Sequence, residues 1–245
     1  MEKNIYELLQ KFDNIKQRGY IPSITNNKNG SGLTLEYLLG STGGDICIPD
    51  FKNIELKTLN TYSNSNLNMF SCAPDGKYCL ATQWLSWKYG YPDKIYRKIR
   101  VLKVLVNTKL NKVGLFFYFS LRVNKKNRTI ILDVYNTKKE LINSDIYWDF
   151  DSIEEKLIRK LSTLALITNQ KMEKNGKIYY KYTDIRIYKL KSFEKFIKLI
   201  ERDMIFVNFK TGVYKSGYYK GKFHDHGTGF EIERENIEKL YNRIY

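Results

Sequence analysis

The fold is indicated most sharply by residues 48–58, which run Ile48-Pro49-Asp50-Phe51-Lys52-Asn53-Ile54-Glu55-Leu56-Lys57-Thr58. Side chains alternate across a β-strand, so Glu55 and Lys57 share one face while Ile54 and Leu56 point to the other. If the segments on either side of the turn at residues 52–53 pair as a short hairpin, Asp50 comes to lie beside Glu55. The stretch therefore predicts an apolar strand face that anchors and a charged face that carries chemistry.

The charged face has the composition of a hydrolytic metal site. Asp50, Glu55 and the backbone carbonyl of Leu56 would form a hard oxygen site for Mg²⁺. Such an ion stabilises charge on a phosphodiester and lowers the pKa of a bound water, and Lys57 would orient that water or help to deprotonate it. The alternative is that an acid, an acid and a lysine at this spacing are ordinary solvated charges, because the string is short.

Composition indicates a globular chain with a polyanionic partner. Lysine and arginine total 42 against 26 aspartate and glutamate, a formal net charge of +16, while 42% of residues are hydrophobic. Basic residues bind phosphates with release of counterions, which favours nucleic acid, although the lysine content is also explained by genome composition. No apolar run is long enough to span a membrane, and the first residues lack a signal's hydrophobic region, so we expect a cytoplasmic protein.

Hydrophobic periodicity predicts a mixed α/β fold with these elements at helical or strand spacing. We expect helices over residues 5–15, 34–39, 151–161 (capped by Asp151 or Ser152) and 192–201, with a mobile loop over 26–32. Strands are expected over 46–48, 53–59, 164–168, 177–188, 204–210 and 221–232, and an antiparallel meander over 99–106, 113–122 and 129–135.

The C-terminal part of the chain predicts a basic hairpin suited to DNA. It interleaves lysines with tyrosine and then reaches two histidines around an aspartate, so that the candidate DNA-binding residues are Lys210, Tyr214, Lys215, Lys220, Lys222, His224, Asp225 and His226. A two-stranded ribbon fits the major groove, where Asp accepts from cytosine and His donates to guanine. The two histidines and the aspartate have three other interpretations: a transition-metal site, acid–base groups of another nuclease type, or turn residues without contacts.

Several strings in this order resemble a known family. They are Asn29-Gly30-Ser31-Gly32-Leu33-Thr34-Leu35-Glu36-Tyr37-Leu38-Leu39-Gly40, then Pro49-Asp50 and Ile54-Glu55-Leu56-Lys57-Thr58. Together they resemble the PD-(D/E)xK nuclease core shared by the MvaI/BcnI restriction endonuclease family and the MutH mismatch-repair nickases. Residues 146–152, 177–182 and 221–228 resemble later segments of the MvaI/BcnI family, so the resemblance extends over about residues 30–232.

The resemblance implies an α+β mixed sheet within a single endonuclease unit, residues 1–245, with a MutH-like two-lobed cleft. A catalytic lobe would span about residues 1–95, and a sheet and DNA-recognition lobe about residues 96–245. Asp50 and Glu55 match the metal-binding acids, Lys57 the catalytic lysine, and Glu36 the helix glutamate that supports the site. Glu36 is otherwise a solvated helix acid.

The same resemblance implies a type II restriction endonuclease that hydrolyses double-stranded DNA with Mg²⁺, for which Mn²⁺ substitutes. It implies a monomer that nicks each strand in turn at a short interrupted palindrome of the C-C-N-G-G kind, paired with a DNA methyltransferase. Where the family has arginines flanking the histidine segment, this chain has Lys210 and Glu231, which puts the inherited target in doubt because lysine lacks the bidentate fork. The alternatives are a MutH-like strand nickase and a DNA-binding module without catalysis.

Overall fold

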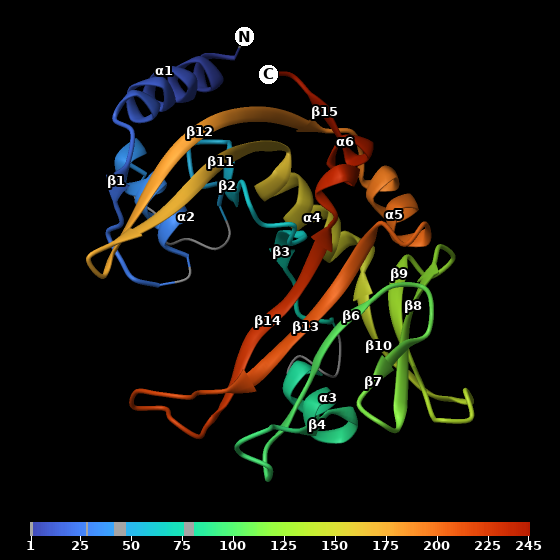
Figure 1. The fold of residues 1–245 in the computed structure, drawn as a ribbon. Coiled ribbons are helices and arrows are strands. Elements are labelled where there is room, and N and C mark those ends of the chain that lie inside the picture. The colour runs from blue at the N-terminus through green and yellow to red at the C-terminus, as the bar shows by residue number, and fades with distance from the viewer. Residues whose placement is uncertain (1, 28, 42–47, 76–80) are drawn as a thin grey trace. The chain divides into compact units, whose positions relative to one another are not determined.

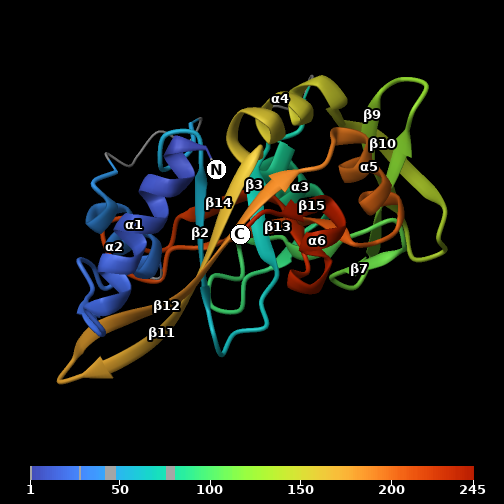
Figure 2. The same cartoon turned by 90° about the horizontal axis from the view of Figure 1, so that it is seen from above.

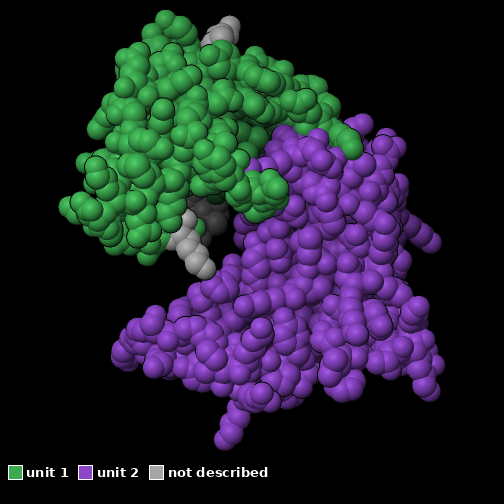
Figure 3. All heavy atoms as spheres, viewed as in Figure 1, with its two compact units in different colours: residues 1–65, 156–191, 238–245 green, residues 66–155, 192–237 purple. Residues whose placement is uncertain are grey.

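Residues 2–27, 29–41, 48–75 and 81–245 are described by the computed structural model. The chain folds into two compact units, each built from separate stretches. Unit 1 comprises residues 1–65, 156–191 and 238–245, and unit 2 comprises residues 66–155 and 192–237 (Figure 3). The boundary that the sequence predicts near residue 95 does not coincide with this interleaved division. The assignment of a catalytic lobe and a recognition lobe stays a prediction.

Unit 1 is built on one mixed sheet in the order β1-β12-β11-β2, with β15 pairing with β12. Its strands are β1 (Ile21–Pro22), β2 (Glu55–Asn60), β11 (Thr163–Lys174), β12 (Lys177–Leu190) and β15 (Tyr241–Arg243). Strands β2 and β11 run parallel, whereas β12 is antiparallel to β11, β1 and β15. A parallel pair requires a crossover connection, and helix α4 (Phe150–Leu161) enters β11 directly from that connection.

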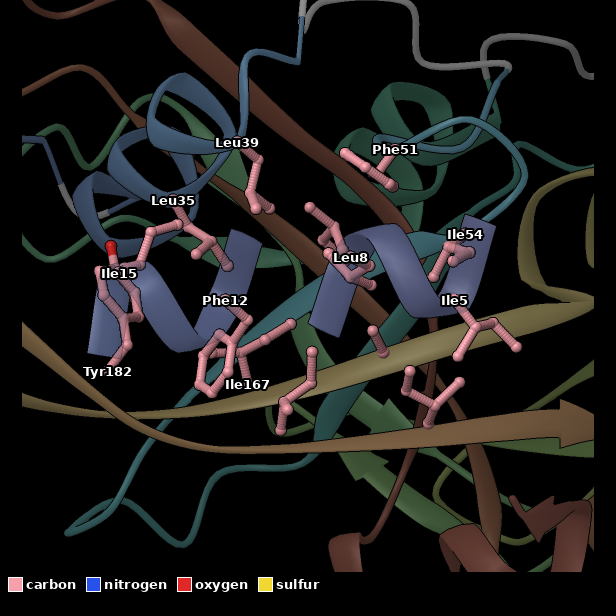
Figure 4. Close-up of a cluster of buried hydrophobic side chains, with 14 of the residues drawn as sticks. Ile5, Leu8, Phe12, Ile15, Leu35, Leu39, Phe51, Ile54, Ile167 and Tyr182 are labelled. Atoms are coloured by element: carbon pink, nitrogen blue, oxygen red, sulfur yellow. The ribbon is translucent and has the colours of Figure 1, made fainter. Parts of the chain in front are cut away.

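Helices α1 (Lys3–Gln17) and α2 (Gly30–Leu39) cover one face of this sheet (Figures 1 and 2). Helix α1 forms as predicted because its apolar residues recur at helical spacing and bury one stripe. In Figure 4 that stripe, represented by Leu8 and Phe12, packs with Leu35 of α2 and Ile54 beside β2. The apolar face of residues 54–58 is therefore the anchor that the sequence predicts.

Helix α2 begins earlier than predicted. Residues 30–32 are helical rather than part of a mobile loop, and Lys28 lies outside the described residues. Gly30 is buried so tightly that a Cβ there would lie 2.9 Å from both Ser23 Oγ and Tyr180 Oη. Packing against the sheet thus holds a glycine-rich stretch in a helix that local sequence disfavours. The predicted end is confirmed, since Gly40 adopts a left-handed φ of 72° after the last turn.

The described part of unit 2 forms two four-stranded sheets and one short pair of strands. The first sheet, in the order β10-β9-β8-β7, is an antiparallel meander, and the second has the order β3-β14-β13-β6. The strands of unit 2 are β3 (Leu67–Ser71), β4 (Tyr91–Pro92), β5 (Arg100–Val101), β6 (Lys103–Val106), β7 (Asn111–Val113), β8 (Phe117–Asn124), β9 (Thr129–Tyr135), β10 (Leu141–Asp149), β13 (Ile205–Val213) and β14 (Phe223–Ile232).

The predicted meander was wrong in one strand. Strand β6 does not pair with the strands that follow it but with β13, through residues such as Val106 opposite Val207. Apolar alternation specifies that a segment is a strand, whereas tertiary packing selects its partner. The predicted strand over residues 46–48 lies mostly outside the described residues.

The residues that the structure describes also form α3 (Ala81–Tyr89), α5 (Phe193–Glu201), a 3₁₀ turn (Arg234–Asn236) and α6 (Ile237–Leu240). The cap of α5 is Ser192, whose Oγ accepts a hydrogen bond from the backbone N–H of Lys195 at 3.2 Å. The predicted cap of α4 was wrong, because the helix already begins at Phe150 and Ser152 instead donates to Asp75 at 2.9 Å. In the described part of the chain, no helix combines the length and apolarity that a membrane span needs.

Candidate active site

The hairpin predicted around residues 52–53 is confirmed. Phe51 and Ile54 form an antiparallel bridge with backbone hydrogen bonds of 3.0 and 2.8 Å, and Lys52 takes a left-handed φ of 55° in the turn between them. The hairpin also sets the position of the Asp50 side chain, whose Oδ2 accepts a hydrogen bond from the backbone N–H of Leu56 at 3.0 Å. The carboxylate of Asp50 therefore lies against the start of β2.

Glu55 is the most deeply buried acid of this cluster, with 1% of its side chain exposed. Its Oε1 lies 2.8 Å from the Lys57 ammonium and 3.5 Å from that of Lys160. Its Oε2 is buried and has no hydrogen-bond partner among the described residues. Burial raises the pKa of Glu55, and the charge and hydrogen bond of Lys57 act in the opposite direction.

Glu36 of α2 belongs to the same electrostatic cluster. Partial burial raises the pKa of its carboxyl, and the negative charge of Asp50 raises it further. The cations Lys57 and Lys160 lower that pKa. The structure thus brings together all four residues that the sequence marks as catalytic.

The donor set suits a divalent cation with oxygen ligands. No group of three or more His, Cys, Asp or Glu that could hold a metal occurs among the residues described. What the hairpin provides is two carboxylates and the backbone of Leu56, a set that matches Mg²⁺, which keeps several waters and few protein ligands. The unpaired Oε2 of Glu55 is the specific sign of fit, because buried oxygens normally have a partner.

Sequence reasoning missed two residues of this site. Lys160 of α4 and Tyr241 of β15 are far from β2 in the chain, and the buried Tyr241 hydroxyl has no hydrogen-bond partner among described residues. Burial raises the pKa of Tyr241, and the charge of Glu55 raises it further, which shows that the two groups are electrostatic neighbours. A signal for Lys160 existed only in the topology, since α4 leads into the strand beside β2.

The basic hairpin, residues 205–232, belongs to unit 2 and holds its lysines in several ways. Lys210 lies 2.6 Å from Glu231, and Lys215 lies 2.7 Å from Asp93. Two of the four predicted DNA-binding lysines are therefore engaged in ion pairs in this structure. Lys222 lies over the rings of two tyrosines, 5.8 Å from the centroid of Tyr218 and 5.4 Å from that of Tyr219, while Lys220 is exposed in the connecting turn.

The two histidines share one face of β14, as the strand pattern predicts. His224 stacks on Tyr214 with ring centroids 4.0 Å apart and an interplanar angle of 12°, and the His226 centroid lies 3.8 Å from that of His224. Asp225 instead lines a pocket of 630 Å³, together with Gln83 of α3.

The turn after Asp225 fixes its carboxylate. Gly227 has a φ of 84° at an irregularity of the β13–β14 register, and its N–H donates to Asp225 Oδ1 at 2.7 Å. Such a bulge re-aims side chains at the edge of a ladder. Gln83 is a further polar group of this pocket that sequence reasoning missed, because nothing in a short helix marks which of its residues lines a pocket with a distant strand.

Comparison with known proteins places these features in one family. The model of the MvaI/BcnI restriction endonuclease family matches residues 9–241. A solved structure titled "Restriction endonuclease MvaI-cognate DNA substrate complex" is similar with a TM-score of 0.91 and 28% identity, over 99% of this chain and 98% of that one. Another, titled "Restriction endonuclease MvaI in the absence of DNA", gives 0.62 and 29%, over 99% and 97%.

No curated protein sequence gives a significant match. The family match nevertheless spans nearly the whole chain, and the structural likeness covers both units. The predicted mixed fold and the predicted family are therefore confirmed. The chain belongs to the MvaI/BcnI restriction endonuclease family and is a type II, site-specific nuclease.

Proposed function

We propose that this enzyme hydrolyses double-stranded DNA at a short specific sequence, with Asp50, Glu55 and Lys57 as the centre of its active site. The observation that carries the proposal is the hairpin, which places Asp50 against Leu56 and leaves one buried oxygen of Glu55 unpaired beside a lysine. The similar MvaI structure with cognate DNA supports duplex DNA as the substrate.

The same three groups that the sequence predicts, the carboxylates of Asp50 and Glu55 and the backbone carbonyl of Leu56, would hold Mg²⁺, with Mn²⁺ as a substitute. A bound ion would supply charge stabilisation for the scissile phosphate and a water of lowered pKa. The protein's own contribution is a preorganised cluster, because Glu55 is buried and its carboxylate lies 2.8 Å from Lys57 and 3.5 Å from Lys160.

Lys57 acts on the attacking water and on the scissile phosphate. Its ammonium is held by Glu55 at 2.8 Å while a quarter of its side chain is exposed, so donors remain for a substrate oxygen. It orients the water or assists its deprotonation and offsets the charge that develops on the phosphate. Glu36 would support this group, as the family resemblance implies, because its carboxyl is an electrostatic neighbour of both Lys57 and Asp50.

The basic hairpin would read the DNA sequence. Lys220 and Lys222 would contact the backbone, while His224 and His226 on one face and Asp225 on the other would reach base edges. Lys210, Tyr214 and Lys215 complete the surface. The target would be a short interrupted palindrome of the C-C-N-G-G kind, or a relative changed by Lys210 and Glu231.

The enzyme would work as a monomer that nicks one strand and then the other, in the cytoplasm, beside a DNA methyltransferase that protects the same sequence. The second candidate is a strand nickase like MutH, which shares the catalytic core that the sequence resembles.

A plasmid assay decides among these functions. Purified protein is incubated with supercoiled plasmid and Mg²⁺, and defined linear fragments are expected, whose sequenced ends give the target and the cleavage offset. Persistent open circles would favour the nickase. Unchanged supercoils with a retained gel shift would favour a DNA-binding module without catalysis.

Substitution in the hairpin tests the site itself. Lys57→Ala and Asp50→Ala are expected to abolish cleavage while leaving specific binding largely intact, because each removes a group that acts on the scissile phosphate. The matched control is Lys52→Ala, which removes a turn lysine of the same hairpin whose ion pair with Glu7 lies at the surface. Cleavage by either active-site variant at the wild-type rate would remove the assignment.

A further inference from the structure

Unit 1 contains a second polar pocket that the proposed catalysis does not use. It has a volume of 210 Å³ and is lined by residues from the start of α2, the end of β2 and the second half of β11. Among the described residues that line it, none is acidic and one is a cation. The polar lining residues that matter here are Asn26, Asn27, Ser31, Asn60, Asn169 and Lys171.

The side chain of Asn169 indicates that the pocket binds a ligand. Asn169 is only 1% exposed, yet neither the nitrogen nor the oxygen of its carboxamide has a hydrogen-bond partner in the described structure. Burying both atoms without partners is unfavourable, so such a group normally bonds to something. The side chain lies in the wall of the pocket, where a ligand would be that partner.

The start of α2 adds donors at the same place. The helix has ten residues, and its N-cap residue, Asn29, makes no side-chain cap hydrogen bond. The first turn of a helix carries N–H groups and a partial positive charge that favour an anion. Ser31 of that turn lines the pocket, and its Oγ lies 2.8 Å from Thr58 Oγ1 on β2.

These groups share one preference. An amide donor, an ammonium and a helix start converge on a space without a described acid, which is the chemistry of an oxyanion site. Lys171 is exposed, so an incoming polyanion reaches it without rearrangement. The oxygen of Asn169 would accept a hydrogen bond from Lys171 or from a water.

We propose that this pocket binds a backbone phosphate of the DNA substrate, a few nucleotides from the bond that is cut. The proposal rests on the proposed function. Asn60, the parallel partner of Asn169, is three residues beyond Lys57 on β2; its side chain points to the opposite face of the sheet, and it lies about 10 Å farther along the strand. That corresponds to about three nucleotide steps along one strand of a duplex, at about 3.4 Å each.

The pocket also connects the substrate to the catalytic cluster. A Cβ on Gly32 would lie 3.7 Å from Glu36 Oε1 and 3.9 Å from Thr58 Oγ1, so the start of α2 adjoins Glu36. A phosphate held at that start fixes the helix that carries Glu36. Binding of the flanking backbone thereby positions the site for the scissile phosphate.

The experiment combines protein variants with neutral DNA linkages. Once sequenced plasmid ends have given the target, single methylphosphonates replace each phosphate within four positions of the cut, and duplex binding is measured by fluorescence anisotropy without divalent ions. The variants are Asn169→Leu and Lys171→Ala. The control is Lys174→Ala, which removes an exposed lysine of the same strand that does not line the pocket.

One methylphosphonate position is expected to weaken wild-type binding about tenfold, equal to about 1.4 kcal/mol. For each pocket variant, the methylphosphonate at that position should not weaken binding further. For Lys174→Ala, the same methylphosphonate should weaken binding as much as it does for the wild type. Lys171→Ala should also reduce the salt slope of binding by about 0.9. Thermal unfolding checks Asn169→Leu, and the exposed Lys171 provides a second variant that does not disturb the core.

Three results would overturn the proposal. If the loss caused by the protein variant and the loss caused by the methylphosphonate multiply at every position, the pocket contacts no phosphate. If Asn169→Leu binds DNA with wild-type affinity, the pocket holds only solvent. Stabilisation of the wild type by inorganic phosphate, without any coupled DNA position, would mean a site for free anions. If the wild type neither binds nor cuts any duplex, the proposed function fails together with the pocket, whereas a cutting wild type confines the failure to the pocket.

Discussion

Glu231→Gln is expected to strengthen the salt dependence of DNA binding. In the structure the Lys210 ammonium lies 2.6 Å from Glu231 Oε1, and the Glu231 side chain is 9% exposed. The ion pair therefore presents no net charge to DNA, although Lys210 alone would present one positive charge. Glutamine keeps an oxygen that can accept from Lys210 but removes the carboxylate, so the ammonium becomes available to a phosphate.

The size of the effect follows from one added charge. Each phosphate that a protein neutralises adds about −0.9 to the slope of log affinity against log salt concentration. Between about 50 and 200 mM salt, a fourfold rise, Glu231→Gln should lose about 3.5 times more affinity than the wild type loses. Non-specific duplex suffices for this measurement because non-specific binding is almost wholly electrostatic.

Fluorescence anisotropy across a salt series provides the assay, with Glu235→Gln as control. Glu235 is exposed in the 3₁₀ turn of the same unit, and its substitution changes the net charge by the same amount. An unchanged slope in Glu231→Gln would show that Lys210 does not gain a phosphate contact. An equal change of slope in Glu235→Gln would contradict the same role, because the effect would then come from net charge and not from Lys210.

Three further substitutions have expected outcomes. His224→Ala should weaken binding to the cognate duplex by about 1–3 kcal/mol if His224 reads a base, and equal losses on random duplex would contradict that role. Lys160→Met should slow cleavage by about tenfold, or about 1.4 kcal/mol, in single-turnover assays, because Glu55 would keep one of its two cations; an unchanged rate would remove Lys160 from the site. Lys215 and two backbone N–H groups lower the pKa of Asp93 to about 2. The stability that this carboxylate gives is complete above its unfolded pKa of about 3.9 and is lost as pH falls through the folded pKa. Asp93→Asn should thus destabilise the protein in urea at pH 7, with a difference that shrinks between about pH 4 and 2; a constant difference would argue against the ion pair.

The sequence predicted the parts of the site that local geometry determines. Strand alternation places Glu55 and Lys57 on one face, and a two-residue turn returns Asp50 to the same place, so all three lie within eight residues. Composition added the charge, and the family resemblance added Glu36. Each of these signals depends on neighbours in the chain, which is why each could be found without a structure.

The missing parts depend on strand partners that no local pattern specifies. Lys160 reaches Glu55 only because β11 pairs parallel with β2, and Asn169 meets Asn60 through the same register. The sequence likewise identified Lys210 and Glu231 as two separate departures from arginine. The structure shows that Lys210 and Glu231 form an ion pair with each other, so their effects on DNA binding are coupled.

The distribution of unpaired buried atoms separates the scaffold from the ligand sites. In unit 2, the hydroxyls of Thr82 and Thr228 lie 2.8 Å apart, and those of Ser86 and Thr211 lie 3.0 Å apart, so this buried polar core satisfies itself. Within the described residues, the buried side-chain atoms without a partner belong to unit 1, apart from one nitrogen of Arg100.

In unit 1 the unpaired atoms gather on the sheet that carries the proposed chemistry. Glu55 and Tyr241 are electrostatic neighbours in the proposed catalytic cluster, Asn169 lines the second pocket, and Thr163 begins β11, the strand that carries Asn169. Unpaired buried polar groups lower the stability of the isolated protein, and a bound ion or phosphate that pairs them recovers it. Unpaired groups on β2 and β11 therefore make the isolated protein less stable and strengthen the binding of a ligand that pairs them. This is a physical reason for a nuclease to keep a buried acid where an apolar residue would pack better.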